Sequence, residues 1–220
     1  MLYVKWGDVG PALERSIASV KQHHPELPVH VHELQSGSTL HDKAEMFDAS
    51  PFEQTLYLDV DTVVLDRLDY AFERAGRHGL ACCICESPWA RRYDGLSDQG
   101  DLVDYNSGVL FFSRAAEPVF RRWAELSPTL DATTRAQRRS DGAIIEQKYN
   151  DQAALAKAID DVRLNPYVLP LNYNFRPRWY KLFWGPIKIW HDYAEVSPGV
   201  LAWNAEQTRP GAMVKFARAE

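Results

Sequence analysis

Cysteine is scarce in this sequence, and all of it lies in one place. The three cysteines, Cys82, Cys83 and Cys85, fall within the apolar run 80–85, and no second cluster exists with which they could pair. An odd, clustered set argues against a disulfide framework and does not complete a cysteine metal site. We therefore expect buried, reduced thiols.

The sequence also lacks long hydrophobic runs and an excess of basic residues. No stretch approaches the ~20 apolar residues that span a bilayer, and the N-terminal residues lack the charged and apolar regions of a signal peptide. A net charge of -5 provides no general field that would hold nucleic acid or anionic lipid. These absences predict a cytoplasmic protein with no membrane span and no nucleic-acid partner.

The overall composition is that of a folded protein. Hydrophobic residues make up 45% and charged residues 25% of the 220 positions, which argues against disorder. A chain of this length can bury a core that is stable without cross-links. We expect one domain, residues 1–220.

Strand-like and helix-like patterns alternate along the chain. Strand patterns occur at 2–6, 29–32, 55–60, 80–85, 109–112 and 187–190. Helix patterns occur from 11, 40 and 65 onward and at 119–126 and 151–159, while 86–104 and 131–149 are polar. This alternation predicts a Rossmann-like α/β fold, with a mostly parallel mixed sheet, helices on both faces, and ligands at the carboxyl ends of the strands.

Four histidines raise the question of a metal site near the N-terminus. His30 and His32 alternate along a predicted strand, and His23 and His24 end a predicted helix. Both patterns are typical of solvated side chains, so we do not expect a metal there.

Two carboxylates follow a predicted apolar strand. Asp59 and Asp61 end the run Leu56-Tyr57-Leu58-Asp59-Val60-Asp61, and extended spacing puts both on one side. Such a pair can hold Mg²⁺ or Mn²⁺, whose remaining positions accept diphosphate oxygens. The pair alone is a weak signal, since two surface aspartates at the start of a loop would look the same.

Other polar residues fit a site at this edge of the sheet. Lys43 lies beside an apolar stripe, so its ammonium could reach a nucleotide or diphosphate. Gly108 could let a sugar ring approach the backbone, while Asn106 hydrogen-bonds a hydroxyl. The plain alternatives are an exposed lysine, a tight turn before a strand, and an Asp151 that caps a helix.

Five short motifs occur in a fixed order: Lys43-Ala44-Glu45, Tyr57-Leu58-Asp59-Val60-Asp61, Tyr105-Asn106-Ser107-Gly108-Val109-Leu110-Phe111-Phe112, Asp151-Gln152-Ala153-Ala154-Leu155 and Ile189-Trp190-His191. This order resembles that of GT-A glycosyltransferases, most nearly family 8 and related nucleotide-diphospho-sugar transferases. The resemblance covers about residues 2–193. Only the ordered set is specific, because each motif alone would be unconvincing.

The resemblance implies a metal site and a nucleotide site. It makes Asp61 and His191 direct ligands of Mn²⁺ or Mg²⁺ and places Asp59 near both the metal and the ribose. Taken alone, His191 ends an apolar strand and could supply a neutral imidazole, although a hydrogen-bonded strand-end histidine is the plain alternative. Trp6 and Asp8 end the first strand, where the family binds the nucleotide base.

The resemblance also implies a sugar site. There Asp151 would hold sugar hydroxyls, Gln152 would lie by the anomeric carbon, and the segment Asn106-Ser107-Gly108 would line the donor site. Because Gln152 is not a carboxylate, we expect retention of configuration. Asp151, or Asp141 or Glu146 further upstream, could instead be the base of an inverting enzyme.

The chain departs from the family pattern after His191. The family has a glycine and a lysine that contact the diphosphate, whereas this chain continues Asp192-Tyr193-Ala194-Glu195. Stabilisation of the leaving group then falls to a basic residue of the preceding segment, the candidates being Arg176, Arg178, Lys181 and Lys188.

The segment 175–190 that carries these residues is also rich in aromatic side chains. We interpret it as a flap over the donor or as a platform for acceptor sugars. A surface that binds nucleic acid or membrane would show a similar composition.

The sequence thus predicts an enzyme that moves a sugar from a nucleotide-diphosphate sugar, UDP-linked, to a carbohydrate, lipid-linked or protein acceptor that stays unidentified. A sugar-phosphate nucleotidyltransferase is a second class, but the loop 7–11 is too short to wrap a triphosphate and has no basic residue. A third is a nucleotide-sugar or carbohydrate-binding domain without turnover.

Overall fold

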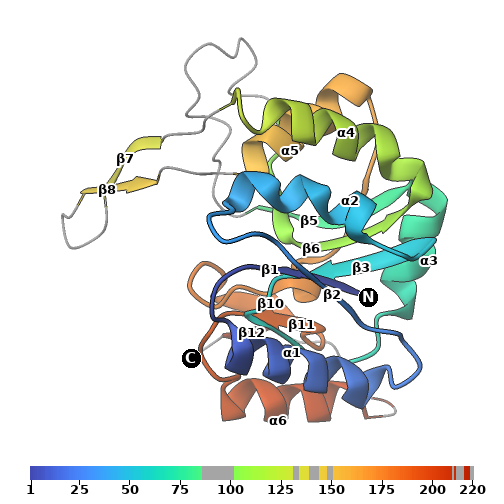
Figure 1. The fold of residues 1–220 in the computed structure, drawn as a ribbon. Helices are drawn as coiled ribbons and strands as arrows, with labels where there is room; N and C mark the ends of the chain where they lie inside the picture. Colours follow the sequence, from blue (N-terminus) through green and yellow to red (C-terminus); the bar gives the residue numbers. More distant parts are fainter. Residues whose placement is uncertain are drawn as a thin grey trace.

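The computed structural model describes residues 1–85, 102–130, 134–138, 144–147, 151–209, 211 and 216–218. A six-stranded sheet with the strand order β2-β1-β3-β6-β5-β9 lies at its centre (Figure 1). Along the chain its strands are β1 Leu2–Lys5, β2 His30–Glu33, β3 Gln54–Leu58, β5 Leu80–Ile84, β6 Tyr105–Ser113 and β9 Tyr167–Val168. The β1–β2, β1–β3 and β5–β9 pairs are parallel, and β6 is antiparallel to both neighbours. The expected mostly parallel mixed sheet is confirmed.

Helices cover both faces of this sheet, because its strands alternate their apolar side chains between the faces. Tyr57, Leu110 and Phe112 pack on one face with α2 (Met46–Ala49), α4 (Glu117–Leu126) and α5 (Gln152–Val162). Leu58 and Phe111 pack on the other face with α1 (Gly10–His23) and α3 (Asp69–His78). These are the two main cores of the fold.

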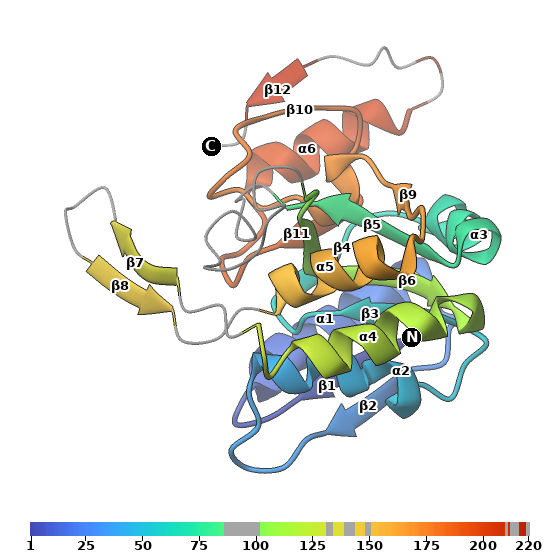
Figure 2. The ribbon, with the colours of Figure 1, turned by 90° about the horizontal axis from the view of Figure 1, so that it is seen from above.

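A third layer is built mainly from the C-terminal part of the chain, together with residues 62–64 (Figure 2). Its elements are β4 Thr62–Val64, η4 Leu171–Asn174, β10 Leu182–Trp184, β11 Ile189–His191, α6 Pro198–Gln207 and β12 Phe216–Arg218. Strand β4 pairs with β11 and β10 pairs with β12, both antiparallel. Phe175, Phe183 and Trp190 form the centre of its small apolar core.

Most predicted elements exist, with shifted ends. The helix predicted from 65 begins at Asp69, because β4 and its turn come first, and it ends before Gly79, whose φ of +79° suits glycine. The helix predicted from 40 is a 3₁₀ turn, η1 Leu40–Glu45, followed by α2. Of the two polar segments, 86–101 lies outside the described residues, and the second contains the hairpin of β7 Thr134–Arg138 and β8 Ile144–Gln147.

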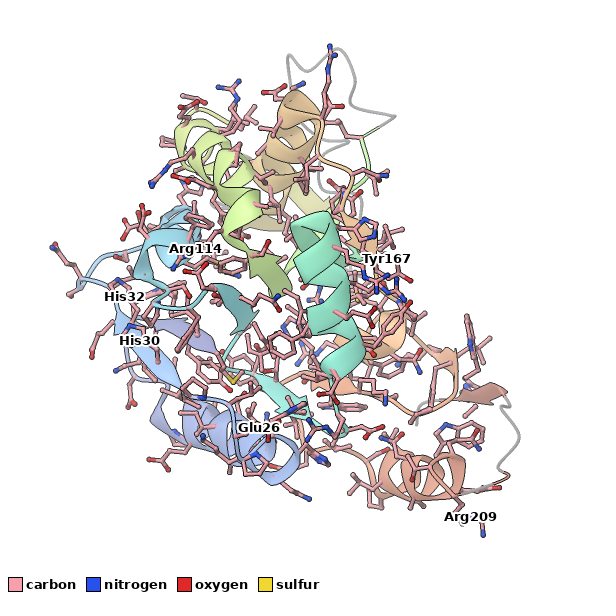
Figure 3. All side chains as sticks on the ribbon, turned by 90° about the vertical axis from the view of Figure 1, so that its right-hand side faces the viewer. Glu26, His30, His32, Arg114, Tyr167 and Arg209 are labelled. Atoms are coloured by element: carbon pink, nitrogen blue, oxygen red, sulfur yellow. The ribbon has the colours of Figure 1, made fainter. Side chains whose placement is uncertain are left out.

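The cysteine prediction is confirmed, since all three thiols are buried and free. The prediction that His24 is solvated was wrong: it is buried, and its Nε2 accepts the backbone N–H of Leu68 at 2.9 Å. His24 therefore joins the end of α1 to the start of α3. His30 and His32 lie on the edge strand β2, at the outside of the molecule (Figure 3).

None of the helices in the described part of the chain has the length and apolar character needed to cross a membrane.

Candidate active site

A tight turn after β3 carries Asp59 and Asp61. The carbonyl of Asp59 accepts both the backbone N–H of Thr62 at 3.2 Å and its hydroxyl at 2.8 Å, so the chain reverses into β4. In the antiparallel β4–β11 pair, Thr62 lies opposite His191. The register of this short ladder brings His191 beside the two aspartates, although about 130 residues separate them.

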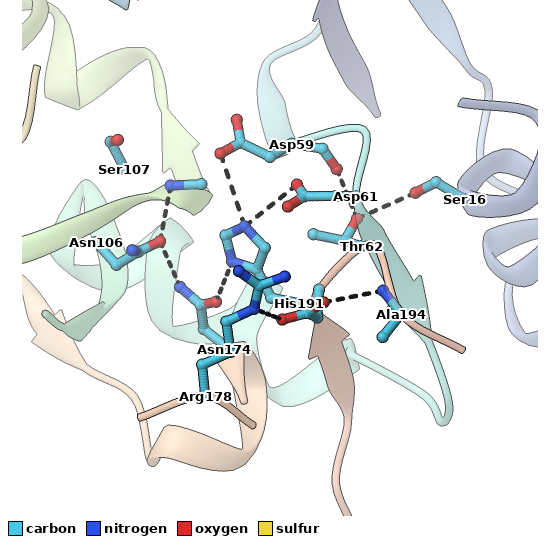
Figure 4. A network of polar contacts seen from close by, with 12 residues as sticks. Ser16, Asp59, Asp61, Thr62, Asn106, Ser107, Asn174, Arg178, His191 and Ala194 are labelled. Atoms are coloured by element: carbon cyan, nitrogen blue, oxygen red, sulfur yellow. Dashed lines mark hydrogen bonds and ion pairs between the residues drawn. The ribbon is translucent and has the colours of Figure 1, made fainter. Parts of the chain in front are cut away.

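The three side chains form a compact group (Figure 4). Nε2 of His191 lies 3.3 Å from Oδ1 of Asp61 and 3.8 Å from Oδ2 of Asp59. One ligand atom from each of the three lies within 4.8 Å of the other two, and no other such group occurs among the residues described here. Two carboxylate oxygens and one imidazole nitrogen suit a divalent cation such as Mn²⁺, and Mg²⁺ with more oxygen ligands from elsewhere.

A chain of hydrogen bonds fixes which nitrogen of His191 carries the proton. The backbone N–H of Gly108 donates to Oδ1 of Asn106 at 2.9 Å, which fixes the Asn106 amide. Nδ2 of Asn174 therefore donates to the same oxygen at 2.8 Å, and Oδ1 of Asn174 faces Nδ1 of His191 at 2.7 Å. In the neutral imidazole Nδ1 must then be the donor, and the lone pair of Nε2 points toward the two aspartates. This tautomer leaves Nε2 free to bind a metal.

Gly108 is needed for these side chains to meet. A Cβ atom at this position would collide with Cε1 of His191 and with Oδ2 of Asp59. The sequence interpretation gave Gly108 a different reason, namely that a sugar ring approaches the backbone. In the structure the side chains of His191 and Asp59 occupy this space.

Lys43 links the metal-ligand group to the predicted sugar site. Its side chain is only 3% exposed, which excludes the alternative of a surface lysine. Nζ lies 2.9 Å from Asp59, 3.3 Å from Asp151 and 3.3 Å from the hydroxyl of Ser107. The 3₁₀ turn that carries it is held by a capping box between Thr39 and Asp42.

The opposite charges of Lys43 and Asp59 shift each other's pKa toward the ionised form. Burial alone would lower the pKa of the Lys43 ammonium, but Asp151 and Asp59 raise that pKa well above its ordinary value. Burial alone would raise the pKa of Asp59, but the positive charge of Lys43 and the hydrogen bond from the Tyr57 hydroxyl lower it below its ordinary value. Lys43, which is buried, and Asp59, which is partly exposed, therefore form an ion pair at neutral pH.

Asp151 precedes helix α5 and Gln152 is its first residue, and both side chains make contacts beyond the helix. The side chain of Asp151 makes no capping hydrogen bond and instead accepts from the Ser107 hydroxyl at 2.5 Å, so the capping alternative is wrong. Oε1 of Gln152 accepts a hydrogen bond from Nδ2 of Asn106 at 2.9 Å. The structure thus brings Lys43, Asn106, Ser107, Asp151 and Gln152 together with the metal-ligand group.

A pocket of about 310 Å³, here called the first pocket, opens beside Asp59 and Asp61 at the carboxyl ends of β1 and β3. Trp6 and Tyr57 form part of its wall, and its apolar lining could accept a planar base. Asp8 does not line it; this residue is exposed, and its carboxylate faces the backbone N–H of Gly10. Of the two residues expected near a nucleotide base, the structure brings only Trp6 to this pocket.

A second pocket, of about 190 Å³, lies against Asp61 and His191. Arg176 and Arg178 line it, whereas Lys188 pairs with Asp66 and Lys181 donates to the carbonyl of Pro177. Of the four basic residues proposed to replace the missing lysine, the two arginines are therefore the ones placed beside the metal-ligand group.

Arg15 of α1 holds the loop that separates the two pockets. Its guanidinium donates to the carbonyls of Asp192 at 3.0 Å and Tyr193 at 3.1 Å, and it pairs with Glu195 at 3.3 Å. Tyr193 lines both pockets. Arg15, Asn174 and Tyr193 were not recognised in the sequence, because nothing in their local pattern marks them; only the tertiary contacts do.

No protein-family model matches the chain, and no curated protein sequence matches it. Among solved structures it is similar to the glycosyltransferase GlyE of Streptococcus pneumoniae TIGR4, with TM-score 0.57, 16% identity, and 88% of this chain and 54% of that chain covered. The chain thus spans about half the length of the GlyE chain.

Two further solved structures match along most of their length. The galactosyltransferase LgtC, in complex with donor and acceptor sugar analogues, gives TM-score 0.50 at 15% identity, with 96% of this chain and 92% of that chain covered. Mouse xyloside xylosyltransferase 1 gives TM-score 0.56 at 12% identity, with 86% of this chain and 96% of that chain covered. All three matches are glycosyltransferases, and the chain has their GT-A-like fold.

Proposed function

We propose that this protein is a glycosyltransferase that moves a sugar from a nucleotide-diphosphate sugar, UDP-linked, to an acceptor, with retention of configuration and with a bound divalent metal. One observation carries the proposal. The hydrogen bonds through Asn106 and Asn174 leave the Nε2 lone pair of His191 facing Asp59 and Asp61, at the edge of the first pocket. With Nε2 unprotonated, three electron-rich groups face one another there, and a bound divalent cation would offset their repulsion.

Asp59, Asp61 and His191 would hold Mn²⁺ or Mg²⁺. A metal there neutralises the charge that develops on a leaving diphosphate. The first pocket, with Trp6 and Tyr57 in its wall, would take the nucleoside. The similarity of the fold to glycosyltransferase structures, one of them in complex with donor and acceptor sugar analogues, supports a donor site in this protein.

The buried polar cluster beyond Asp59 would bind the donor sugar. Asn106, Ser107, Asp151 and Gln152 offer hydrogen-bonding groups there, and Lys43 supplies a positive charge within ion-pair distance of Asp59 and Asp151. Asp151 is engaged by both Lys43 and Ser107, which makes it a poor general base. This engagement supports retention over inversion.

A screen of nucleotide sugars tests the proposal without an acceptor. Wild-type protein is incubated with UDP-, GDP-, ADP- and CDP-linked sugars in Mn²⁺, and the release of the nucleoside diphosphate by slow hydrolysis is measured. We expect release from UDP-sugars that stops when EDTA is added and returns with excess Mn²⁺. Binding of a sugar nucleotide without release would indicate a binding domain, and neither binding nor release would refute the proposal.

A further inference from the structure

The second pocket has features that donor binding alone does not use. It is bounded by Arg176, Arg178 and Trp179 on one side and by His191, Asp192 and Tyr193 on the other. Trp179 is 45% exposed and Tyr193 is 62% exposed, although both are large aromatic side chains. Exposed rings beside a pocket are the usual means by which proteins stack on a sugar ring.

Arg178 is held so that it presents a positive charge to this pocket. Its Nε donates to the carboxylate of Asp192 at 2.8 Å, and Asp192 is buried and also accepts the backbone N–H of Ala194 at 2.9 Å. The two terminal nitrogens of Arg178 make no hydrogen bond within the described part of the chain. A guanidinium fixed at Nε keeps a free pair of donors that matches a carboxylate or phosphate.

The surrounding charges leave the pocket suited to an anion. Asp192 pairs with Arg178, and Asp61 faces His191 and belongs to the proposed metal site. Arg176 adds a second positive charge to the wall. An anionic group would therefore meet the terminal nitrogens of Arg178, while Asp61 and Asp192 are already engaged.

The position of the pocket fits an acceptor. It shares Asp61 and His191 with the metal-ligand group, and it shares Tyr193 with the first pocket. A molecule bound there therefore lies next to both the first pocket and the proposed metal site. An acceptor hydroxyl can reach the anomeric carbon only from such an adjoining site.

We infer that the second pocket is the acceptor subsite and that the acceptor is an anionic carbohydrate, one that bears a carboxylate or phosphate. Its anionic group binds Arg178, and its ring lies against Trp179 and Tyr193. This inference rests on the proposed glycosyl transfer. In that reaction the acceptor oxygen bonds to the anomeric carbon as the bond to the diphosphate breaks, the bonding pair leaves with the nucleoside diphosphate, and the hydroxyl proton passes to the leaving group.

The test uses matched acceptors: methyl hexosides, the corresponding methyl hexuronides and the corresponding hexose 6-phosphates. Each is added to wild-type protein with the UDP-sugar and Mn²⁺ selected by the hydrolysis screen, and the release of UDP above hydrolysis is measured. We expect the acidic members to stimulate release and their neutral counterparts to stimulate it at least tenfold less. Equal stimulation by neutral and acidic members, or stimulation by none, would overturn the inference.

Two variants test which anion Arg178 binds, that of the acceptor or the diphosphate of the donor. Loss of one charge-assisted hydrogen bond in Arg178→Gln should raise the KM of the acidic acceptor by roughly tenfold or more relative to any change in the Kd of UDP with Mn²⁺. Arg209→Gln removes an exposed arginine that pairs with Glu206 and serves as the control.

If Arg178→Gln instead weakens UDP binding as much as it weakens the acceptor, the arginine binds the donor and the acceptor assignment is wrong. Failure of the glycosyltransferase proposal is a separate outcome, because wild-type protein would then release no UDP even in the hydrolysis screen.

Discussion

Nδ1 of His191 donates a hydrogen bond to Oδ1 of Asn174 at 2.7 Å, and this contact sets the chemistry of the opposite nitrogen. Asn174 ends the 3₁₀ turn η4, just before Phe175, whose backbone bonds to that of β11. The amide itself is oriented by Asn106. A residue that no ligand would touch thus determines whether the imidazole can bind a metal.

Asn174→Leu should therefore weaken Mn²⁺ binding while the chain stays folded. Without its acceptor, Nδ1 no longer holds the proton, and we expect roughly a 10- to 100-fold loss of metal affinity. Isothermal titration with Mn²⁺ measures the loss, and circular dichroism checks the fold. Asn165→Leu, at an exposed position, is the control and should bind Mn²⁺ as the wild type does. Unchanged Mn²⁺ affinity in Asn174→Leu would show that the hydrogen bond from His191 to Asn174 does not control metal binding.

Gly108→Ala should damage the site and the fold together. The new Cβ collides with the side chains of His191 and Asp59, and overpacking of this kind costs about 1–3 kcal/mol. We expect a lower melting temperature and loss of Mn²⁺-dependent hydrolysis. Gly10→Ala is the matched change, because a Cβ there meets only Asp8 at an ordinary 3.8 Å, and it should leave both properties nearly unchanged. An active Gly108→Ala would mean that the two ligands are not packed against this residue.

Lys43→Met should destabilise the protein more than loss of a surface ion pair would. The change leaves Asp59 and Asp151 without their shared cation, and removal of one partner of a buried pair costs about 3–5 kcal/mol. The matched variant Arg77→Met breaks an exposed pair with Glu73, which is worth about 0–1 kcal/mol. Urea unfolding of both variants measures the difference. Equal losses would contradict the buried-pair interpretation.

The sequence was sufficient for the main sheet because its strands carry strong patterns. Residues 56–58 and 109–112 are continuous apolar runs, and helix α4 repeats Val119, Phe120 and Trp123 at helical spacing. Strands β4, β9, β10 and β12 have two or three residues each, too few to show a period, and they exist because tertiary pairing supplies their partners.

Some residues of the candidate site could be predicted from local sequence, and others could not. Asp59 and Asp61 could be predicted from the strand before them, since a strand that ends in two carboxylates is a local feature. Asn174 could not, because it lies 17 residues before His191 and only the packing of η4 against β11 brings the two together. The clamp from Arg15 to the loop 192–195 spans nearly the whole chain and leaves no trace in either local sequence.

UDP and Mn²⁺ together should raise the melting temperature far more than either alone. Asp59, Asp61 and His191 offer only three ligand atoms within 4.8 Å, so a bound cation needs further oxygens, which a diphosphate in the adjoining pocket would supply. At 100 times the Kd, a ligand that binds only the native state adds about 2.7 kcal/mol. For a domain of this size, that corresponds to a shift of roughly 5–10 °C. Differential scanning fluorimetry with UDP, GDP, ADP and CDP then ranks the base preference.

Two aspartate variants make this experiment specific to the proposed ligands. Asp61→Ala should abolish the Mn²⁺-dependent part of the shift, because it removes a carboxylate 3.3 Å from Nε2 of His191. Asp8→Ala removes an exposed aspartate outside the first pocket and should keep the full shift. A shift that survives in Asp61→Ala would place the metal elsewhere. If no nucleoside diphosphate stabilises the wild-type protein in millimolar Mn²⁺ or Mg²⁺, the donor site is wrong, and the two aspartates are better explained as the polar end of a strand.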